Sequence, residues 1–132
     1  HVYFSQGEVD GAGANRSMPA YLMNPAQERA KYPSETDKTM TLLSLVTAKG
    51  PIAEVNWFAV HPTSMTYYNK LVSGDNKGYA SMVIEAEQKT TYHRPDDFVA
   101  LFAQTNCGDV TPNLNLNNTG PGKTDTESTQ II

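Results

Sequence analysis

The strongest constraint on the fold is a strand–helix–strand pattern in the second half of the chain. Residues 53–61 (AEVNWFAVH) form a β-branched and aromatic run with Gly-Pro before it and Pro after it, which predicts a strand. Residues 74–89 predict a helix, and residues 98–105 (FVALFAQT) form an almost wholly apolar run, typical of a strand covered on both faces. Two strands joined by a helix form a βαβ unit, so we expect parallel strands and an α/β fold.

Polar residues follow both predicted strands at their carboxyl ends. His61 ends the first strand, and the segment NCGDVTPN (106–113) follows the second. Because parallel strands place their carboxyl ends on one edge, and ligands bind at that edge in open α/β sheets, these segments should meet in a site. The sequence therefore predicts that His61 and the loop around Thr111 are neighbours.

The other segments predict shorter elements. Val2–Phe4 is a short apolar strand that runs into a Gly-rich loop, and residues 24–32 (NPAQERAKY) predict a short helix with Asn24 as its N-cap. Residues 39–48 are apolar enough for a strand or a helix, and their periodicity does not decide between the two.

The helix predicted over residues 74–89 has a cap and an apolar face. Asp75 or Asn76 supplies the cap. The apolar face is expected to contain Tyr79, Met82, Val83 and Ala86.

Composition narrows the class of function. The chain has 132 residues, of which 39% are hydrophobic and 18% charged, so uncharged polar residues are plentiful, which favours a loop-rich extracellular or hydrolase-like domain. A net charge of −4 and scattered Lys and Arg argue against nucleic-acid binding, and no apolar run approaches the roughly 18 residues of a membrane span. The single cysteine, Cys107, predicts a buried thiol. The chain lacks an initiator Met and a compact ending, so we expect a fragment truncated at both ends.

Each candidate site residue also has a structural explanation. A histidine placed like His61 is more often structural than a metal ligand, and His1 and His93 do not complete a zinc site, which needs three or four ligands. Arg16 follows a Gly-rich loop that lacks the third Gly of a dinucleotide fingerprint; it is a surface cation or a planar donor aimed at an oxygen. The Thr111 hydroxyl satisfies backbone groups, or reacts with His61 as its base.

Three segments taken together are far more specific than any one of them. In order and spacing they resemble the neutral (neutral/alkaline, non-lysosomal) ceramidase family: NRSMPAYLMNPAQER (15–29), NWFAVHPTSM…LVSGDNKGYAS (56–81) and FVALFAQTNCGDVTPN (98–113). The resemblance covers residues 5–119. It implies that residues 1–132 are part of an N-terminal catalytic domain, a βαβ-containing piece of a larger mixed-sheet domain with long polar loops at the carboxyl edge.

The resemblance implies a zinc amidohydrolase that cleaves the amide of N-acylsphingosine (ceramide) to sphingosine and a fatty acid. His61 would be one of four zinc ligands, with a second His, a Glu and a Tyr lying outside the chain. Arg16 would face the reacting carbonyl. Thr111 stands where the family usually has a Ser discussed as nucleophile or positioning residue. Because Thr adds a methyl group and a stiffer side chain, it favours attack by a zinc-activated water over an acyl-enzyme.

Two other readings stay open at the level of sequence. One is a metal-free acyl-transfer hydrolase that uses Thr111 and His61, and the other is a non-catalytic, lipid-binding family member. By resemblance we expect a ceramide or sphingolipid substrate at a membrane or micelle surface, and a full-length protein that is secreted or membrane-associated. The isolated chain, with one zinc ligand, is expected to be inactive, and its oligomeric state is not predicted.

Overall fold

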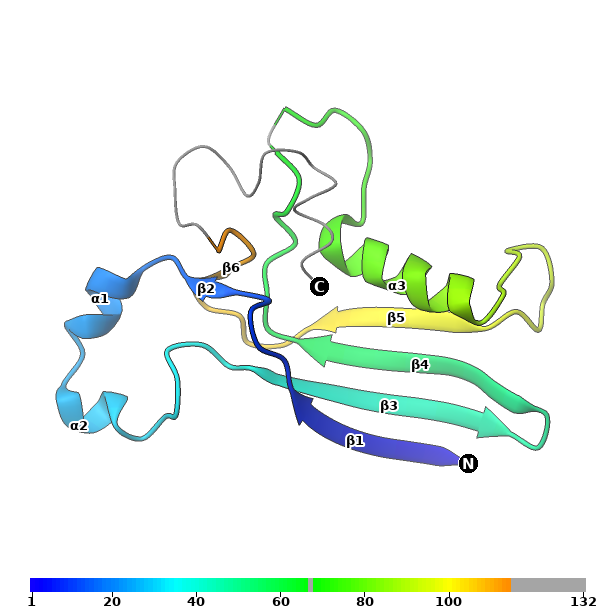
Figure 1. The fold of residues 1–132 in the computed structure, drawn as a ribbon, viewed down its shortest axis with the longest axis horizontal. Helices are drawn as coiled ribbons and strands as arrows, with labels where there is room; N and C mark the ends of the chain where they lie inside the picture. The colour runs from blue at the N-terminus through cyan, green and yellow to red at the C-terminus, as the bar shows by residue number, and fades with distance from the viewer. Residues whose placement is uncertain (67, 115–132) are drawn as a thin grey trace.

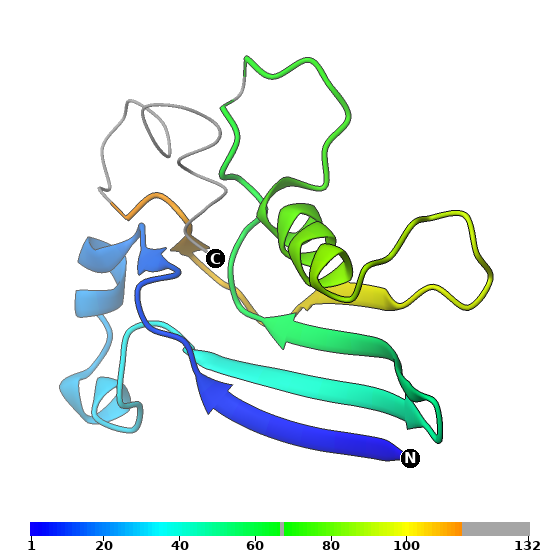
Figure 2. The same ribbon diagram turned by 45° about the vertical axis from the view of Figure 1, so that its right-hand side comes forward.

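The fold is a mixed sheet with one covering helix and a small second sheet at one end. A computed structural model describes residues 1–66 and 68–114 (Figures 1 and 2). The elements are β1 (Val2–Glu8), β2 (Ala14–Asn15), α1 (Met18–Leu22), α2 (Ala26–Arg29), β3 (Thr39–Thr47), β4 (Gly50–Phe58), α3 (Asp75–Glu87), β5 (Val99–Gln104) and β6 (Val110–Thr111).

The strand order of the larger sheet is β1-β3-β4-β5. The β1–β3 and β3–β4 pairs are antiparallel, whereas β4 and β5 are parallel, in register from Ala53 opposite Val99 to Phe58 opposite Gln104. Helix α3 connects the parallel pair and lies along it on one side of the sheet (Figures 1 and 2). The predicted βαβ unit is therefore confirmed, within a sheet that is mostly antiparallel.

Several predicted boundaries were wrong. Strand β4 spans Gly50–Phe58 rather than 53–61, because it extends back through Pro51 in a hairpin with β3 and ends before His61. The ambiguous residues 39–48 form strand β3. Helix α2 is shorter than expected, and Pro25, not Asn24, is its N-cap. Helix α1 was not predicted.

The apolar patterns of α3 and β5 also predicted the wrong buried faces. The buried residues of α3 are Asn76 and Ala80, whereas Met82 is 59% exposed, so the helix packs on the sheet through a different face from the predicted one. In β5, Ala100 is buried but Leu101 is 52% exposed, so the strand is covered on one face only. The residues that α3 buries are a polar one and a small one, which a count of large apolar residues does not reveal.

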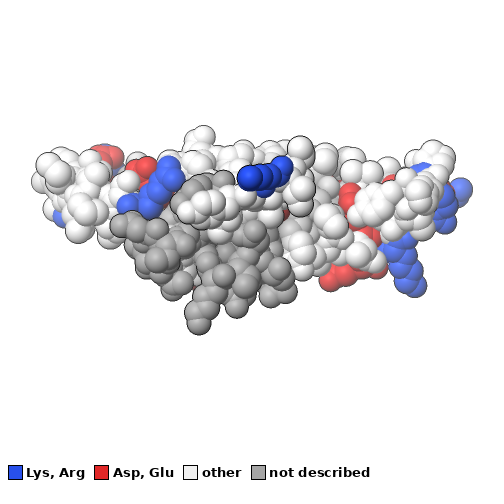
Figure 3. Space-filling view, turned by 90° about the horizontal axis from the view of Figure 1, so that it is seen from above, with Lys and Arg blue, Asp and Glu red and all other residues white. Residues whose placement is uncertain are grey.

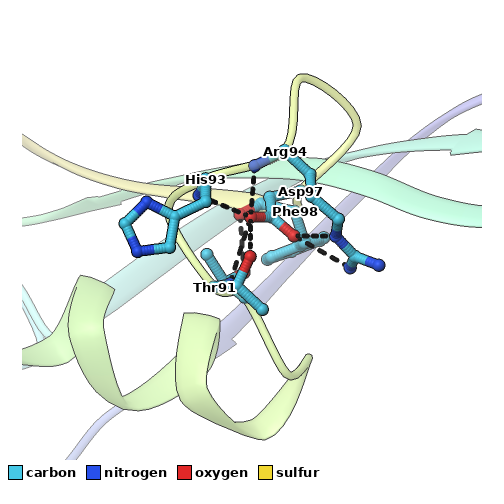
Figure 4. Close-up of polar contacts among 6 residues, drawn as sticks. Thr91, His93, Arg94, Asp97 and Phe98 are labelled. Atoms are coloured by element: carbon cyan, nitrogen blue, oxygen red, sulfur yellow. Dashed lines mark hydrogen bonds and ion pairs between the residues drawn. The ribbon is translucent and has the colours of Figure 1, made fainter.

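The turn between α3 and β5 is organised around one carboxylate, Asp97 (Figure 4). Its Oδ2 accepts the backbone N–H groups of Thr91, His93 and Arg94, and its Oδ1 accepts both Nε and Nη2 of Arg94. Burial alone would raise the pKa of this carboxyl, but the hydrogen bonds from Thr91 and Arg94 outweigh burial and hold the pKa well below its usual range. Asp97 thus fixes the entry to β5.

The buried apolar core lies at the carboxyl end of β4. Ala12, Phe58, Val60 and Val110 form this cluster, with Val9 and Met40 packed against it. Since Val60 and Val110 immediately precede His61 and Thr111 in the sequence, the core supports the predicted site directly.

Candidate functional site

The predicted site residues meet around the short strand β6. Strand β2 pairs with β6, placing Ala14 opposite Thr111 and Asn15 opposite Val110, and Arg16 follows Asn15 directly. The His61 N–H donates to the Val110 carbonyl at 3.2 Å. The structure therefore brings segments 14–16, 61 and 110–111 together at the carboxyl edge of β4 and β5 (Figure 1).

The His61 ring is held in one tautomer. Its Nδ1 lies 2.7 Å from the Val110 carbonyl oxygen, which can only accept, so Nδ1 carries the proton. In the neutral ring, Nε2 then carries the lone pair. A backbone carbonyl on Nδ1 is a common way to orient a histidine whose Nε2 binds a metal.

A thiol lies against the second ring nitrogen of His61, Nε2. Cys107 Sγ is 3.7 Å from His61 Nε2 and, given the tautomer, is the donor in this contact. Cys107 is a half-buried free cysteine, where the sequence predicted a buried one. The sequence did not predict its contact with His61.

Lys77 is a second group that the sequence did not reveal. From the first turn of α3 its Nζ donates to the Phe58 carbonyl at 2.8 Å and to the Ala103 carbonyl at 3.5 Å, which joins the ends of β4 and β5. Burial lowers the pKa of Lys77 from 10.5 to about 8, and the nearby Cys107 sulfur opposes this shift. The site edge therefore holds an amine that is partly neutral near pH 8.

Arg16 is exposed but fixed at its backbone. Its N–H donates to the Asp109 carbonyl at 3.0 Å, and the Asn15 amide oxygen accepts the Ser17 N–H at 2.7 Å. The side chain is half exposed, with Nε 4.0 Å from an Asp109 carboxylate oxygen, a weak surface ion pair. The Asp109 carboxylate therefore holds the guanidinium only weakly.

Thr111 is buried, with 7% of its surface exposed. Its Oγ1 accepts the Asn113 N–H at 3.3 Å, which leaves the hydroxyl proton to donate. Both ring nitrogens of His61 have other partners, Val110 and Cys107, so the geometry does not pair His61 with Thr111 as base and nucleophile.

The residues at this edge fit one part of a metal site. Among residues 1–66 and 68–114 no group of three or more His, Cys, Asp or Glu side chains could hold a metal ion. With Nδ1 bound to a backbone carbonyl, the His61 ring would offer Nε2 to a metal, which suits a zinc ligand. A groove of about 650 Å³ lies elsewhere, lined by Glu8, Tyr21, Tyr32 and residues 33–39.

The charged side chains are dispersed over the surface seen in Figure 3. On the face seen in Figure 3, basic and acidic side chains lie in separate small groups among uncharged ones, without a continuous basic stripe over the described residues. None of the helices described is long and apolar enough to cross a membrane.

A parallel strand pair with a histidine and a hydroxyl loop on its carboxyl edge defines the class of α/β proteins that bind ligands at such an edge. Comparison with known proteins then identifies the family. The profile described as "Neutral/alkaline non-lysosomal ceramidase, N-terminal" matches residues 1–130. The chain belongs to the neutral/alkaline non-lysosomal ceramidase family, which confirms the resemblance found in the sequence.

Individual relatives agree with this assignment. The neutral ceramidase of Pseudomonas aeruginosa is 42% identical over 133 residues, covering 99% of this chain and 19% of the relative, and neutral ceramidase B of Dictyostelium discoideum is 45% identical over 117 residues, covering 86% and 16%. A solved structure titled "Ceramidase complexed with C2" superposes with a TM-score of 0.79 at 41% identity, covering 98% of this chain and 20% of that one. The crystal structure of the Pseudomonas aeruginosa neutral ceramidase gives a TM-score of 0.78 at 42% identity, with the same coverage. The chain thus spans about a fifth of the length of these two ceramidase structures.

Proposed function

We propose that the intact protein containing this chain hydrolyses the amide bond of N-acylsphingosine to sphingosine and a free fatty acid. The family and the names of the relatives support this activity. The observation that carries the role of this chain is the fixed tautomer of His61, whose unprotonated Nε2 lies at the same sheet edge as Arg16 and Thr111. We place residues 1–132 within the N-terminal catalytic domain.

His61 would supply one ligand of a zinc ion through Nε2, with the remaining ligands outside this chain. A zinc ion held there would lower the pKa of a bound water to about 7 and so supply a nucleophile at neutral pH. Val110 keeps the imidazole in the ligating tautomer, since its carbonyl binds the proton on Nδ1.

Arg16 and Thr111 would act on the substrate. The half-exposed Arg16 guanidinium would donate to the amide oxygen as negative charge develops on it, a contact whose loss costs roughly 3 kcal/mol in comparable oxyanion sites. Thr111 would position the substrate with its free hydroxyl proton. This role agrees better with the geometry than a covalent one, because His61 is directed elsewhere.

The decisive test compares two histidine substitutions in the full-length protein. We expect His61→Ala to lose both bound zinc and ceramide hydrolysis, and a chelator to abolish wild-type hydrolysis reversibly. His93→Ala is the matched control, because His93 is exposed in the turn before β5, and it should keep both properties. Chelator-insensitive hydrolysis, or a His61→Ala variant with full zinc content, would overturn the metal assignment.

Thr111→Val distinguishes positioning from covalent catalysis. A positioning hydroxyl predicts partial loss of hydrolysis and no acyl-enzyme in the wild type, whereas a nucleophile predicts total loss and an acyl group that can be trapped on Thr111. In cell fractionation, we expect the full-length protein in the secreted or membrane-associated fraction, because its proposed lipid substrate lies at membranes.

A further inference from the structure

The loop that carries His61 is clamped by the first turn of α3. The two Asp75 carboxylate oxygens accept the backbone N–H groups of Ser64 and Met65, at 2.8 and 2.9 Å. The Asn76 side-chain Nδ2 donates to the His61 carbonyl at 2.9 Å and to Ser64 Oγ at 3.0 Å. Four hydrogen bonds therefore tie residues 61–65 to two adjacent side chains.

The Asn76 side chain and its partner Ser64 are sheltered from water. Asn76 and Ser64 are both 0% exposed, so their hydrogen bonds do not compete with solvent. The amide of Asn76 has only one usable orientation, because the His61 carbonyl must receive a donor. Breaking the bond between Asn76 and the His61 carbonyl would leave a partly buried carbonyl without this donor, which costs more than the bond itself contributes.

The backbone adopts an uncommon conformation at the clamp. Asp75 has a φ of 53°, in the left-handed region that Asp and Asn tolerate better than most residues. A Cβ on the preceding residue, Gly74, would lie 2.8 Å from the Gly78 Cα, so this position takes only glycine without a shift. From this conformation the Asp75 carboxylate reaches the loop.

The clamp replaces the capping role predicted from the sequence. Gly74 occupies the N-cap position of α3 and makes no side-chain capping bond. Asp75 accepts the N–H of Asn76 at 2.7 Å, but its carboxylate is otherwise committed to Ser64 and Met65. The acidic and amide groups at this helix end thus hold another segment.

We propose that Asp75 and Asn76 are positioning residues for His61. The His61 backbone N–H and ring Nδ1 both bond to the Val110 carbonyl, and Asn76 holds the His61 carbonyl on the other side. His61 is therefore fixed through its N–H, its C=O and its ring. This inference rests on the proposed role of His61 as a zinc ligand.

The test measures zinc affinity of the full-length apoprotein by competition with a chromogenic chelator, which does not depend on activity. Asp75→Asn keeps the size of the side chain and its tolerance of positive φ, but presents an NH₂ group to one of two N–H donors. Asn76→Asp presents an oxygen to the His61 carbonyl. We expect either variant to lower the affinity for zinc roughly 10- to 100-fold, the usual effect of losing groups that orient a ligand.

Asp97→Asn is the matched control. Asp97 likewise accepts backbone N–H groups, three of them, but it does so in the turn before β5, at the opposite end of the sheet (Figure 1). It should lower the stability of the apoprotein in urea denaturation without changing zinc affinity. A Co²⁺-loaded sample gives a second readout, since a displaced His61 should alter the visible spectrum of Asp75→Asn but not that of Asp97→Asn.

The zinc affinities of these variants distinguish the positioning role of Asp75 and Asn76 from the proposed role of His61 as a zinc ligand. If His61→Ala loses zinc while Asp75→Asn and Asn76→Asp bind it as tightly as the wild type, the positioning role is overturned and the metal assignment stands. If His61→Ala itself binds zinc as tightly as the wild type, both are overturned. Lower affinity in both clamp variants, with Asp97→Asn unchanged, supports the proposal.

Discussion

Adding one methyl group at Gly13 should disturb both the core and the site. A Cβ at this position would lie 2.6 Å from Val110 Cγ1 and 3.6 Å from Val60 Cγ2. Because two carbon atoms pack best at about 3.5–4.0 Å, Gly13→Ala requires Val110 to move by roughly 1 Å. The backbone of Gly13 lies outside the left-handed region, so steric overlap is the main penalty.

The magnitude follows from the crowding of this core. Overpacking a well-packed interior costs about 1–3 kcal/mol. Val110 also carries the carbonyl that binds the N–H and Nδ1 of His61, so a displaced Val110 should weaken the orientation of that ring. We therefore expect Gly13→Ala to lower both the free energy of unfolding and the rate of ceramide hydrolysis in the full-length protein.

Gly7→Ala is the matched control for this prediction. Gly7 lies in strand β1, and its added Cβ would meet nothing within 4 Å. A compatible Gly→Ala change is neutral or stabilises by about 0.4–1 kcal/mol. Urea denaturation and a hydrolysis assay on both variants make the comparison. If Gly13→Ala matched Gly7→Ala in stability and rate, the inference that Val110 couples the core to His61 would be wrong.

Three further predictions concern titration and the thiol. The Lys77 pKa is about 8 in the folded protein and 10.5 in the unfolded chain, so the unfolded chain binds more protons between these pH values. The free energy of unfolding should therefore rise with pH from about 8 to 10.5. Lys77→Gln should flatten this rise. Because the Asp97 pKa is depressed from 3.8, the carboxylate contributes fully to the free energy of unfolding above that pH, and the contribution is lost as the pH falls below it. Asp97→Asn should therefore lower stability at neutral pH and weaken the loss of stability in acid. An unchanged loss of stability in acid would contradict this prediction. Alkylation of Cys107 with iodoacetamide would place a group against His61 Nε2, so it should weaken zinc binding. Bound zinc should in turn slow the alkylation, which mass spectrometry measures. Equal labelling with and without zinc would refute the contact.

The sequence predicted the site edge better than it predicted the packing. The parallel strands follow from local apolar patterns, and parallel pairing by itself places His61 and the 106–113 loop on one edge. Large apolar residues on α3 pointed to the wrong face, however. The burial of a helix depends on which neighbours it meets, and the residues that α3 buries are Asn76 and Ala80.

The sequence by itself determined the βαβ unit, the loop chemistry at its carboxyl edge and, through its three segments, the family. Only the tertiary structure decided that β2 pairs with β6, which places Ala14 opposite Thr111 and Arg16 beside Asp109, or that Val110 fixes the His61 tautomer. The same holds for Asp75, which the sequence predicted as a possible helix cap and whose carboxylate instead binds the backbone of the 61–65 loop. Contacts between residues far apart in the chain depend on how the loops between them close, and the local sequence pattern does not predict this closure.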